Sequence, residues 1–339
     1  MARIGGAPLP TITDDRALGS ADIQRSLRFN NDDGVFLSRT PSSAGNRKTW
    51  TWSAWIKRAN IGSRQILFSA DDNATHATYF ILELQSDDNL RCLAGQETAS
   101  ATCVKETTMV IRDTTNWYHL VFKFDATNAS AVWYVNGQEI TTLNSSTNPS
   151  NQDFQVNATS QHFLGRFGSS LGTSYFDGYM AEVNFIDGQA LDSSYFGFTE
   201  SQTGIWRPKR YEGTYGTNGF YLDFSDNSST AALGIDKSPN GNDITVDGTL
   251  ATTDSMLDTP TNIFCTWNSM STDNRPDIQE GNLKNMGTNN TACNGTIGVT
   301  SGKWYWEQYC LTDNSSSSSI TTAGVTKYEQ ENDGDVEPR

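Results

Sequence analysis

Residues Tyr175–Leu191, YFDGYMAEVNFIDGQAL, decide the fold that this sequence predicts. Between residues 179 and 186 the side chains alternate, so that four of them share one face of an extended chain: Tyr179, Ala181, Val183 and Phe185. Such a two-residue period predicts a β-strand, because successive side chains of a strand point to opposite faces of the sheet. An Asp-Gly pair stands at each end of the run, and both residue types favour turns. The stretch therefore predicts one strand of a twisted antiparallel sheet.

Further short runs of alternating or apolar residues stand on both sides of this strand. Trp50, Trp52 and Ala54 alternate with their neighbours, and Asn136-Gly137 predicts a tight hairpin turn. Apolar runs recur at the spacing of an all-β sandwich, at residues 66–68, 79–84, 109–111, 117–124 and 131–135. Residues 27–29 and 35–37, separated by a turn, predict another short hairpin. The pattern predicts about ten to twelve strands in two packed antiparallel sheets, a jelly-roll sandwich.

Three of these stretches also resemble a known family. Residues 175–191 are similar to the closing strand of laminin-G-like domains, in the concanavalin A-like lectin/glucanase superfamily. Residues 47–57, RKTWTWSAWIK, resemble the early core strand of these domains, and residues 116–137 resemble the central strand–hairpin–strand. The three matches follow one another in the order of that family. The resemblance implies a concanavalin A-like sandwich over residues 26–200, with ligand loops on the concave side.

A second resemblance lies near the C-terminus. Residues 302–307, GKWYWE, with 295–298 before them and 323–325 behind them, are similar to the opening half of SPRY domains, which are also β-sandwiches. Trp304 and Trp306 alternate as in a buried strand. Roughly half of the strands of such a domain are missing, so we expect a second, incomplete sandwich. Either the chain is a fragment of a longer fibre, which we favour, or this part is marginally stable.

Residue composition and hydrophobic patterning divide the chain into four parts. Residues 1–25 hold scattered apolar side chains among Gly, Pro and Asp, and we expect an N-terminal docking arm there, with a loose tail as the alternative. Residues 26–200 form the predicted sandwich. Residues 201–258, with short strands, either extend the sandwich or form a bridge to the next part of the chain. We interpret them as a bridge, in which Trp206 packs on the rim of the sandwich. Residues 259–339 hold the partial SPRY-like segment.

The composition excludes several classes of protein. The 339 residues include 9 Trp and 16 Phe, enough aromatic side chains to fill the core of a folded protein. A formal net charge of −15, with no basic cluster beyond residues 207–210, speaks against nucleic-acid binding. The acidic surface also repels anionic glycans unless a divalent cation bridges them. The sequence contains no apolar run of about 18 residues, so it predicts no membrane span. The N-terminus does not resemble a secretory signal peptide.

Catalytic patterns are not found in the sequence, so we expect no enzyme. Glucanases of the superfamily carry Glu-x-Asp-x-x-Glu on one strand, whereas here Glu182 is the one carboxylate inside the best strand and Asn184 stands where a partner is needed. His119, one of 3 histidines, lies in an apolar run, where a hydrogen-bonded structural role is the commoner one. The 5 cysteines include no Cys-x-x-Cys pair and predict free thiols rather than zinc ligands.

Ligand sites are less clear from the sequence. Oxygen-rich loops at residues 32–33, 71–73 and 87–89 keep Ca²⁺ open as a cofactor, since laminin-G-like relatives often hold it with loop carboxylates and carbonyl oxygens. Acidic turns are also ordinary features of exposed loops. Sugar binding uses aromatic side chains near turns, and four tyrosines stand at such positions, where core packing explains them equally well: Tyr175, Tyr195, Tyr211 and Tyr215.

Together the two resemblances look most like structural or fibre proteins of tailed bacteriophages. They imply a virion protein, assembled in the host cytoplasm, that is anchored by its N-terminus as a tail fibre or surface fibre. Its lectin-like domain would recognise a host glycan or protein, and analogy with fibres favours a homotrimer. Docking to other virion proteins is expected through five apolar residues of the arm: Ile4, Leu9, Ile12, Leu18 and Ile23. The alternatives are a passive capsid decoration or adaptor protein and a carbohydrate-active enzyme.

Overall fold

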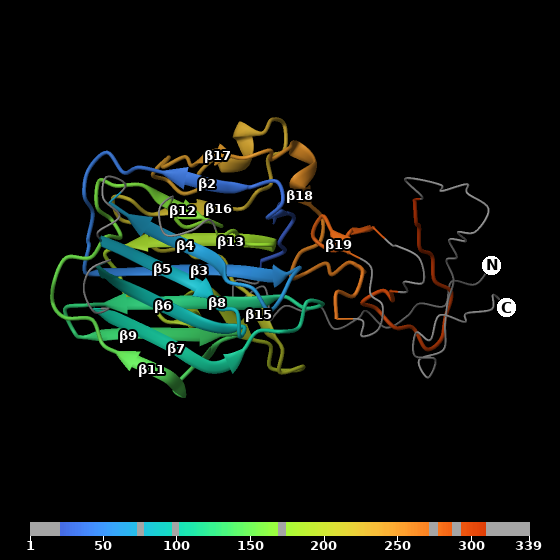
Figure 1. Cartoon of the computed structure of the whole chain (residues 1–339), viewed down its shortest axis with the longest axis horizontal. Helices are drawn as coiled ribbons and strands as arrows, with labels where there is room; N and C mark the ends of the chain where they lie inside the picture. The colour runs from blue at the N-terminus through green and yellow to red at the C-terminus, as the bar shows by residue number, and fades with distance from the viewer. Residues whose placement is uncertain are drawn as a thin grey trace, which may run out of the picture. The chain divides into compact units, whose positions relative to one another are not determined.

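Two large antiparallel sheets, stacked on one another, make up most of the molecule (Figure 1). The computed structural model describes residues 21–72, 78–96, 102–168, 174–270, 277–286 and 293–309. The chain divides into two units, residues 1–264 and residues 265–339, and both large sheets belong to the first unit. This architecture confirms the predicted all-β, concanavalin A-like sandwich. Within the described ranges, no helix is long and apolar enough to cross a membrane.

The strands of the two sheets come from distant parts of the sequence. The first sheet contains, in spatial order, β10 (Gln138–Glu139), β9 (Ser130–Val135), β8 (Tyr118–Asp125), β3 (Thr49–Arg58), β13 (Gly178–Asp187), β1 (Ser26–Phe29) and β18 (Ser255–Met256), and β16 (Phe220–Leu222) also pairs with β13. The second sheet contains β11 (Leu143–Thr147), β7 (Cys103–Val110), β6 (Asn89–Gln96), β5 (Thr78–Leu84), β4 (Gln65–Asp71), β12 (His162–Leu164), β2 (Phe36–Arg39) and β17 (Thr245–Asp247).

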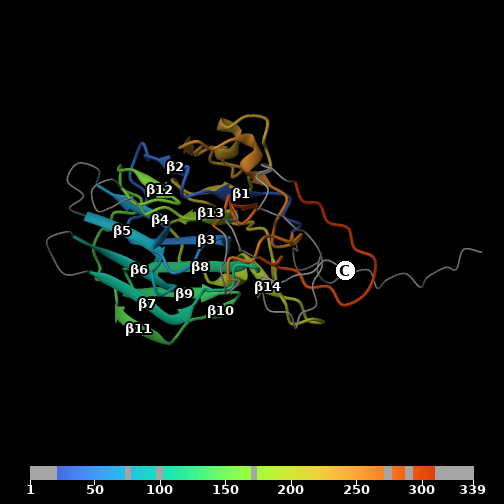
Figure 2. The ribbon, with the colours of Figure 1, turned by 45° about the vertical axis from the view of Figure 1, so that its right-hand side comes forward.

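Short elements complete the first unit. A two-stranded sheet is formed by β14 (Gly197–Thr199) and β15 (Trp206–Pro208). Three single-turn 3₁₀ helices connect the strands of the last third: η1 (Ser193–Tyr195), η2 (Ala231–Gly234) and η3 (Thr252–Asp254). In Figure 2, β5, β6 and β7 are seen in one layer and β3 and β8 in the other.

Aromatic rings fill the space between the two sheets. Trp50 is fully buried, and its ring centroid lies 5.0 Å from those of Phe80 and Phe124 and 6.3 Å from that of Phe68. Phe80 and Phe68 come from the second sheet, while Trp50 and Phe124 come from the first. Rings of this size bury large apolar areas, and offset or edge-to-face pairs add to the stabilisation. The alternating Trp50 and Trp52 thus face a core, as the sequence predicted.

Strand β13 is confirmed as the central strand, but its alternation breaks at a β-bulge. The register with β3 shifts between Ala181 and Asn184, and Glu182 takes a left-handed backbone conformation with φ +50°. Before the bulge Tyr179 and Ala181 lie on the outer side, whereas after it Val183 and Phe185 lie in the core. The predicted common face of these four residues is therefore wrong, because one extra residue in a strand turns the following side chains over.

The bulge also explains how residues 201–258 join the sandwich. Before it, β13 pairs with β1, and after it, β13 pairs with β16. Strand β17 pairs with β2, and β18 pairs with β1, so this segment contributes strands to both sheets. Of the two alternatives for these residues, the structure shows an extension of the sandwich past residue 200 rather than the expected bridge. Likewise, β1 and β2 belong to different sheets, and the hairpin predicted for residues 27–37 is not formed.

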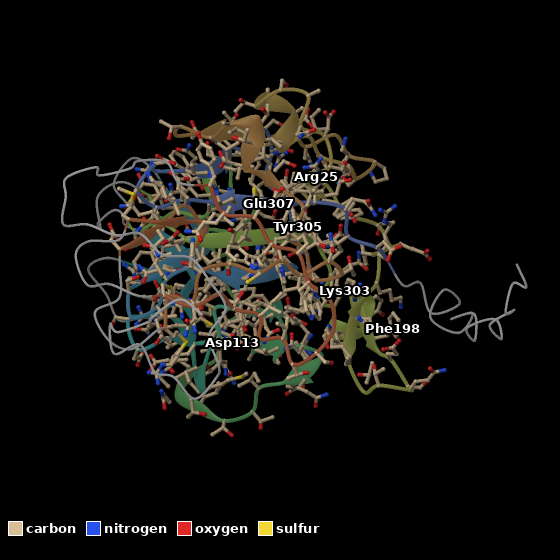
Figure 3. All side chains as sticks on the ribbon, turned by 90° about the vertical axis from the view of Figure 1, so that its right-hand side faces the viewer. Arg25, Asp113, Phe198, Lys303, Tyr305 and Glu307 are labelled. Atoms are coloured by element: carbon tan, nitrogen blue, oxygen red, sulfur yellow. The ribbon has the colours of Figure 1, made fainter. Side chains whose placement is uncertain are left out.

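The second unit has little regular structure among its described residues. Strands β19 (Ile278–Gln279) and β20 (Lys284–Asn285) form a two-stranded sheet. The buried strand predicted at residues 302–307 is not formed, and Trp304 and Trp306 are 65% and 53% exposed. Figure 3 labels Lys303, Tyr305 and Glu307 on this segment, where the Tyr305 hydroxyl donates a hydrogen bond to Glu307. The SPRY-like arrangement is not seen in the described part of this unit.

Candidate functional site

The outer face of the first sheet is covered by the chain itself. Residues that follow β13 fold over this face and bury a cluster that contains Val121, Tyr134, Ile186, Leu191, Phe196, Tyr211, Tyr215 and Tyr221. A neighbouring cluster contains Ile23, Trp55, Trp117, Tyr179 and Ala181, with Trp206 and Met256 packed against it. Arg25, Asp113 and Phe198 are seen at the end of the sandwich in Figure 3. This face is therefore internal packing rather than an open binding surface.

His119 shows how tightly that face is closed. The Trp206 ring stacks on the His119 ring with centroids 5.9 Å apart, and the indole Nε1–H donates to His119 Nδ1 at 3.0 Å. Because an indole nitrogen only donates, the neutral imidazole carries its proton on Nε2, which donates to Ser53 Oγ at 3.0 Å. Burial lowers the pKa of His119 to about 3. The predicted structural role of His119 and the predicted packing of Trp206 are both confirmed.

The outer face of the second sheet carries a different arrangement, an arginine surrounded by three aromatic rings. The guanidinium carbon of Arg166 lies 4.6 Å from the ring centroid of Phe36, 5.6 Å from that of Tyr175 and 5.8 Å from that of Phe163. These distances are within the range of cation–π attraction. We name these four residues the Arg166 cluster. Phe163 is buried, while Arg166, Phe36 and Tyr175 are partly exposed.

Strand alternation places the cluster on the outer face. Leu37 and Leu164 point into the core, so Phe36 on β2 and Phe163 on β12 point outward. Arg166 and Tyr175 face each other in an isolated antiparallel bridge, next to the hydrogen bond from Phe176 N to Gly165 O at 2.9 Å. Gly165 has φ +81° and lies against Phe29, so a side chain there would be strained. This turn sets Arg166 over the rings.

The guanidinium of Arg166 has free hydrogen-bond donors. Its Nε is buried without a hydrogen-bond partner. Among the described residues, no hydrogen bond or ion pair involves its two terminal nitrogens, which are therefore open to solvent. Elsewhere on the same face Glu83, which is fully buried, pairs with both Arg64 and Arg91. That carboxylate is neutralised by its own partners and leaves Arg166 as a cation with unused donors.

The loops predicted as calcium ligands are used differently. Asp88 is 3% exposed, and its carboxylate accepts hydrogen bonds from Arg58, Arg112 and the Gly62 backbone N–H, all at 2.8 Å. These bonds hold the pKa of Asp88 below its usual value against the opposing effect of burial. Two guanidinium groups and a backbone N–H occupy the oxygens that a cation would need, so this loop does not fit Ca²⁺.

The described residues of the other predicted calcium loops add no ligand set. Asp33 accepts a hydrogen bond from Asn30, and Asn73 lies outside the described residues. In the ranges that the structure describes, no group of three or more His, Cys, Asp or Glu side chains is arranged to hold a metal ion. Calcium therefore remains a prediction without a site. Cys92 and Cys103 are buried free thiols, and burial raises the pKa of Cys92.

Glu182 is the one carboxylate of the best strand, and Asn184 stands where a catalytic partner is needed. Both residues lie under the covered face. The Tyr221 hydroxyl donates to the Glu182 carboxylate, 2.8 and 2.7 Å from its two oxygens, and the Tyr215 hydroxyl donates to Asn184 Oδ1 at 3.0 Å. Burial raises the pKa of Glu182 to about 7, although the hydrogen bonds from Tyr221 and the nearby Arg210 act in the opposite direction. The pair thus takes part in packing between β13 and β16.

The four tyrosines considered for sugar binding lie in different environments in the structure. Tyr175 belongs to the Arg166 cluster, Tyr195 is 47% exposed, and Tyr211 and Tyr215 are buried in the covered face. Sequence reasoning missed Arg166, Phe36 and Phe163 because they stand far apart in the sequence without a shared motif. The nearest signal was the string HFLGRFG at residues 162–168, in which Phe163 and Arg166 lie close together.

The predicted docking residues of the N-terminal arm are only partly covered by the structure. Ile23 is 3% exposed and packs within this chain, and its backbone N–H donates to Thr261 Oγ1 at 3.0 Å. Its side chain is thus taken up by the sandwich, which corrects the expectation that it is available to a partner. Ile4, Leu9, Ile12 and Leu18 lie outside the described residues.

Comparisons with known proteins agree with this fold. Residues 29–194 match the family model described as the concanavalin A-like lectin/glucanases superfamily. This part of the chain is therefore similar to the superfamily that the resemblance in the sequence indicated. No curated protein matches the chain.

Several solved structures are similar at low identity. A putative carbohydrate binding protein from Bacteroides ovatus is 18% identical with a TM-score of 0.44, and the match covers 67% of this chain and 59% of that chain. A heptameric SAP-like pentraxin from Limulus polyphemus is 17% identical with a TM-score of 0.41, over 60% of this chain and 94% of that one. Domain 4 of the arabinanase AbnA from Geobacillus stearothermophilus, solved with arabinotriose, is 19% identical with a TM-score of 0.35, over 52% and 72%.

Proposed function

We propose that this chain recognises saccharides on a cell surface and binds them without turnover, through the outer face of its second sheet. The observation that carries the proposal is the Arg166 cluster, the set of partly exposed rings around a guanidinium with free donors. Residues 29–194 match a superfamily of lectins and glucanases. The other outer face is filled by the chain's own residues. On the second sheet Ile66, Ile81 and Phe167 form a buried cluster, whereas the Arg166 cluster is partly exposed and gives a ligand access.

The chemistry of the cluster suits a sugar. A pyranose ring presents apolar C–H faces that pack on aromatic rings, and hydroxyl groups that accept hydrogen bonds from a guanidinium or a phenol. Phe36 and Tyr175 offer the rings, while Arg166 and the Tyr175 hydroxyl offer the polar contacts. A few placed polar groups among apolar side chains are what ligand sites generally provide.

Binding without catalysis is supported by the state of the best candidate acid. Glu182 is enclosed by Tyr221 on the face that the chain covers, on the sheet opposite to the Arg166 cluster. A glycosidase needs two carboxyl groups placed on either side of a scissile bond. A carboxyl packed against a neighbouring strand does not meet this need.

The wider role that we propose is that of a virion fibre. It rests on the resemblance of residues 175–191 and of the C-terminal segment to fibre proteins of tailed bacteriophages. Residues 1–25, apart from the packed Ile23, would be the docking arm, and a homotrimer would be the assembly. Several copies on one particle would add avidity to weak single contacts. A capsid decoration or adaptor protein without a ligand is the second candidate.

A glycan array with the full-length chain tests saccharide recognition. We expect binding to a subset of bacterial surface polysaccharides, with no release of reducing ends on incubation. A folded chain that binds no saccharide would contradict the proposal, and released sugar would show an enzyme instead.

Electron microscopy of phage particles, labelled with antibody against residues 26–200, tests the virion role separately. Label at fibre tips is expected. Label over the capsid would favour the decoration protein, and particles without label would remove the virion assignment while leaving saccharide binding untouched.

A further inference from the structure

We infer that the ligand of the Arg166 cluster is an acidic saccharide, and that the Arg166 guanidinium binds its carboxylate. This inference rests on the saccharide recognition proposed above and adds the chemical class of the sugar. Uronic acids and sialic acids share the required group, a carboxylate attached to a sugar ring.

The other arginines of the sandwich show what is unusual about Arg166. Many of them pair with a carboxylate of the chain: Arg28 with Asp254, Arg47 with Asp153, Arg58 and Arg112 with Asp88, Arg64 and Arg91 with Glu83, and Arg207 with Glu200. The sequence holds 39 Asp and Glu against 24 Lys and Arg, so acidic partners are plentiful. Among the described residues, none of them pairs with Arg166, although it lies in a structured turn.

No hydrogen bond among the described residues uses the terminal donors of Arg166. When a guanidinium stacks on an aromatic ring through its flat face, its N–H groups lie in the guanidinium plane and stay available. The terminal nitrogens of Arg166 can therefore donate two parallel hydrogen bonds to the two oxygens of a carboxylate. The contact with Phe36, at 4.6 Å, already limits the motion of the side chain, so less conformational entropy is lost on binding.

The strongly acidic composition does not oppose this contact. At physiological ionic strength the Debye length is about 8 Å, so most of the charges on the surface are screened from a ligand at Arg166. Asp247 lies opposite Phe36 in the pairing of β17 with β2, and its carboxylate accepts a hydrogen bond from Ser38 Oγ at 2.6 Å. Glu83, on the same face of the sheet, is neutralised by Arg64 and Arg91. The Arg166 guanidinium thus supplies the positive charge for binding an acidic saccharide. On net charge alone, a divalent cation would be needed to bridge the acidic surface and the ligand.

Calorimetry with matched pairs of ligands tests the inference on the full-length chain. The probes are trigalacturonate against its methyl ester, and sialyllactose against lactose, since each pair differs mainly in the carboxylate. We expect at least one acid to bind more tightly than its neutral counterpart. Arg166→Gln should weaken binding of that acid about tenfold to a hundredfold, because a hydrogen-bonded charge is lost, and should weaken binding of the neutral counterpart much less.

Arg112→Gln is the matched control, since it removes one positive charge from a side chain that is 54% exposed and leaves Asp88 paired with Arg58. It should bind the acid as the unaltered chain does. Equal affinity for acid and neutral sugar, or full affinity in a folded Arg166→Gln variant, would overturn the inference. Binding of only neutral saccharides on the glycan array would also overturn it while sparing the proposed function, and binding of no saccharide would overturn both.

Discussion

The two outer faces of the sandwich differ in what covers them. Over the first sheet, residues from the last third of the first unit bury aromatic and polar side chains, and even His119 is closed off by Trp206. Over the second sheet, Arg166 stays partly exposed with unused donors. The comparison indicates a division of labour, in which one face stabilises the domain and the other recognises a ligand. Substitutions on the two faces should therefore change different measurements.

Asp258→Ala should have the largest effect on stability. Asp258 lies 2.7 Å from Lys57 Nζ and accepts a hydrogen bond from Trp117 Nε1 at 3.0 Å, with Lys57 only 1% exposed. Removal of the carboxylate leaves a buried ammonium without a partner, which costs about 3–5 kcal/mol. Urea unfolding measures the loss. Asp153→Ala, at a carboxylate that is 59% exposed, should change the free energy of unfolding by less than about 0.5 kcal/mol. Equal effects of the two would contradict the closed first face.

Trp206→Ala should come next. Its ring lies on His119 and between Gly137 and Gly197, where added side chains would collide with it. Because the ring is half-buried, we expect a loss of about 2–4 kcal/mol, near the lower end for a large aromatic residue. Trp206→Phe keeps most of the packing but removes the hydrogen bond to His119, which costs about 1 kcal/mol. If Trp206→Ala unfolds at the same urea concentration as the unaltered chain, β15 does not close this face.

Glu182 should make the stability of the first face depend on pH. Its pKa is about 7 in the folded chain, above the ordinary value of 4.5, so the folded state binds the proton more tightly than the unfolded state. The stabilisation is fully present below about pH 4.5 and is lost as the pH rises through 7. We expect the free energy of unfolding to fall by about 1–3 kcal/mol over this range, and the fall to be absent in Glu182→Gln. Identical pH profiles of the two chains would show that Glu182 is not enclosed.

The fold was predictable where the alternation of side chains shows which side of a strand faces the core. Trp50 and Trp52 alternate because one side of their strand faces a core, and residues 175–191 alternate for the same reason. The period could not reveal the bulge at Glu182, because a single residue with positive φ leaves the composition of the strand unchanged. Nor could it assign residues 201–258, whose strands of two or three residues are too short to show any period.

The candidate site was less predictable, because it depends on residues that only the fold brings together. Phe36 and Tyr175 stand about 140 positions apart in the sequence, yet their ring centroids lie 6.3 Å apart. The sequence marks Tyr175 only by its place near a turn, which is a weak signal that three other tyrosines share. Arg166 resembled an ordinary surface arginine until the structure placed rings around it and showed no acidic partner among the described residues.

Arg166→Gln should have the smallest effect on stability and thereby sharpen the comparison of the two faces. An exposed cation–π contact contributes about 0.5–1 kcal/mol, and Phe163 remains buried without the guanidinium. We expect the urea midpoint to shift only slightly while acidic saccharide is no longer bound at the original affinity. Loss of stability as large as that of Trp206→Ala would mean that Arg166 holds the fold together, and the second face would then be packing like the first.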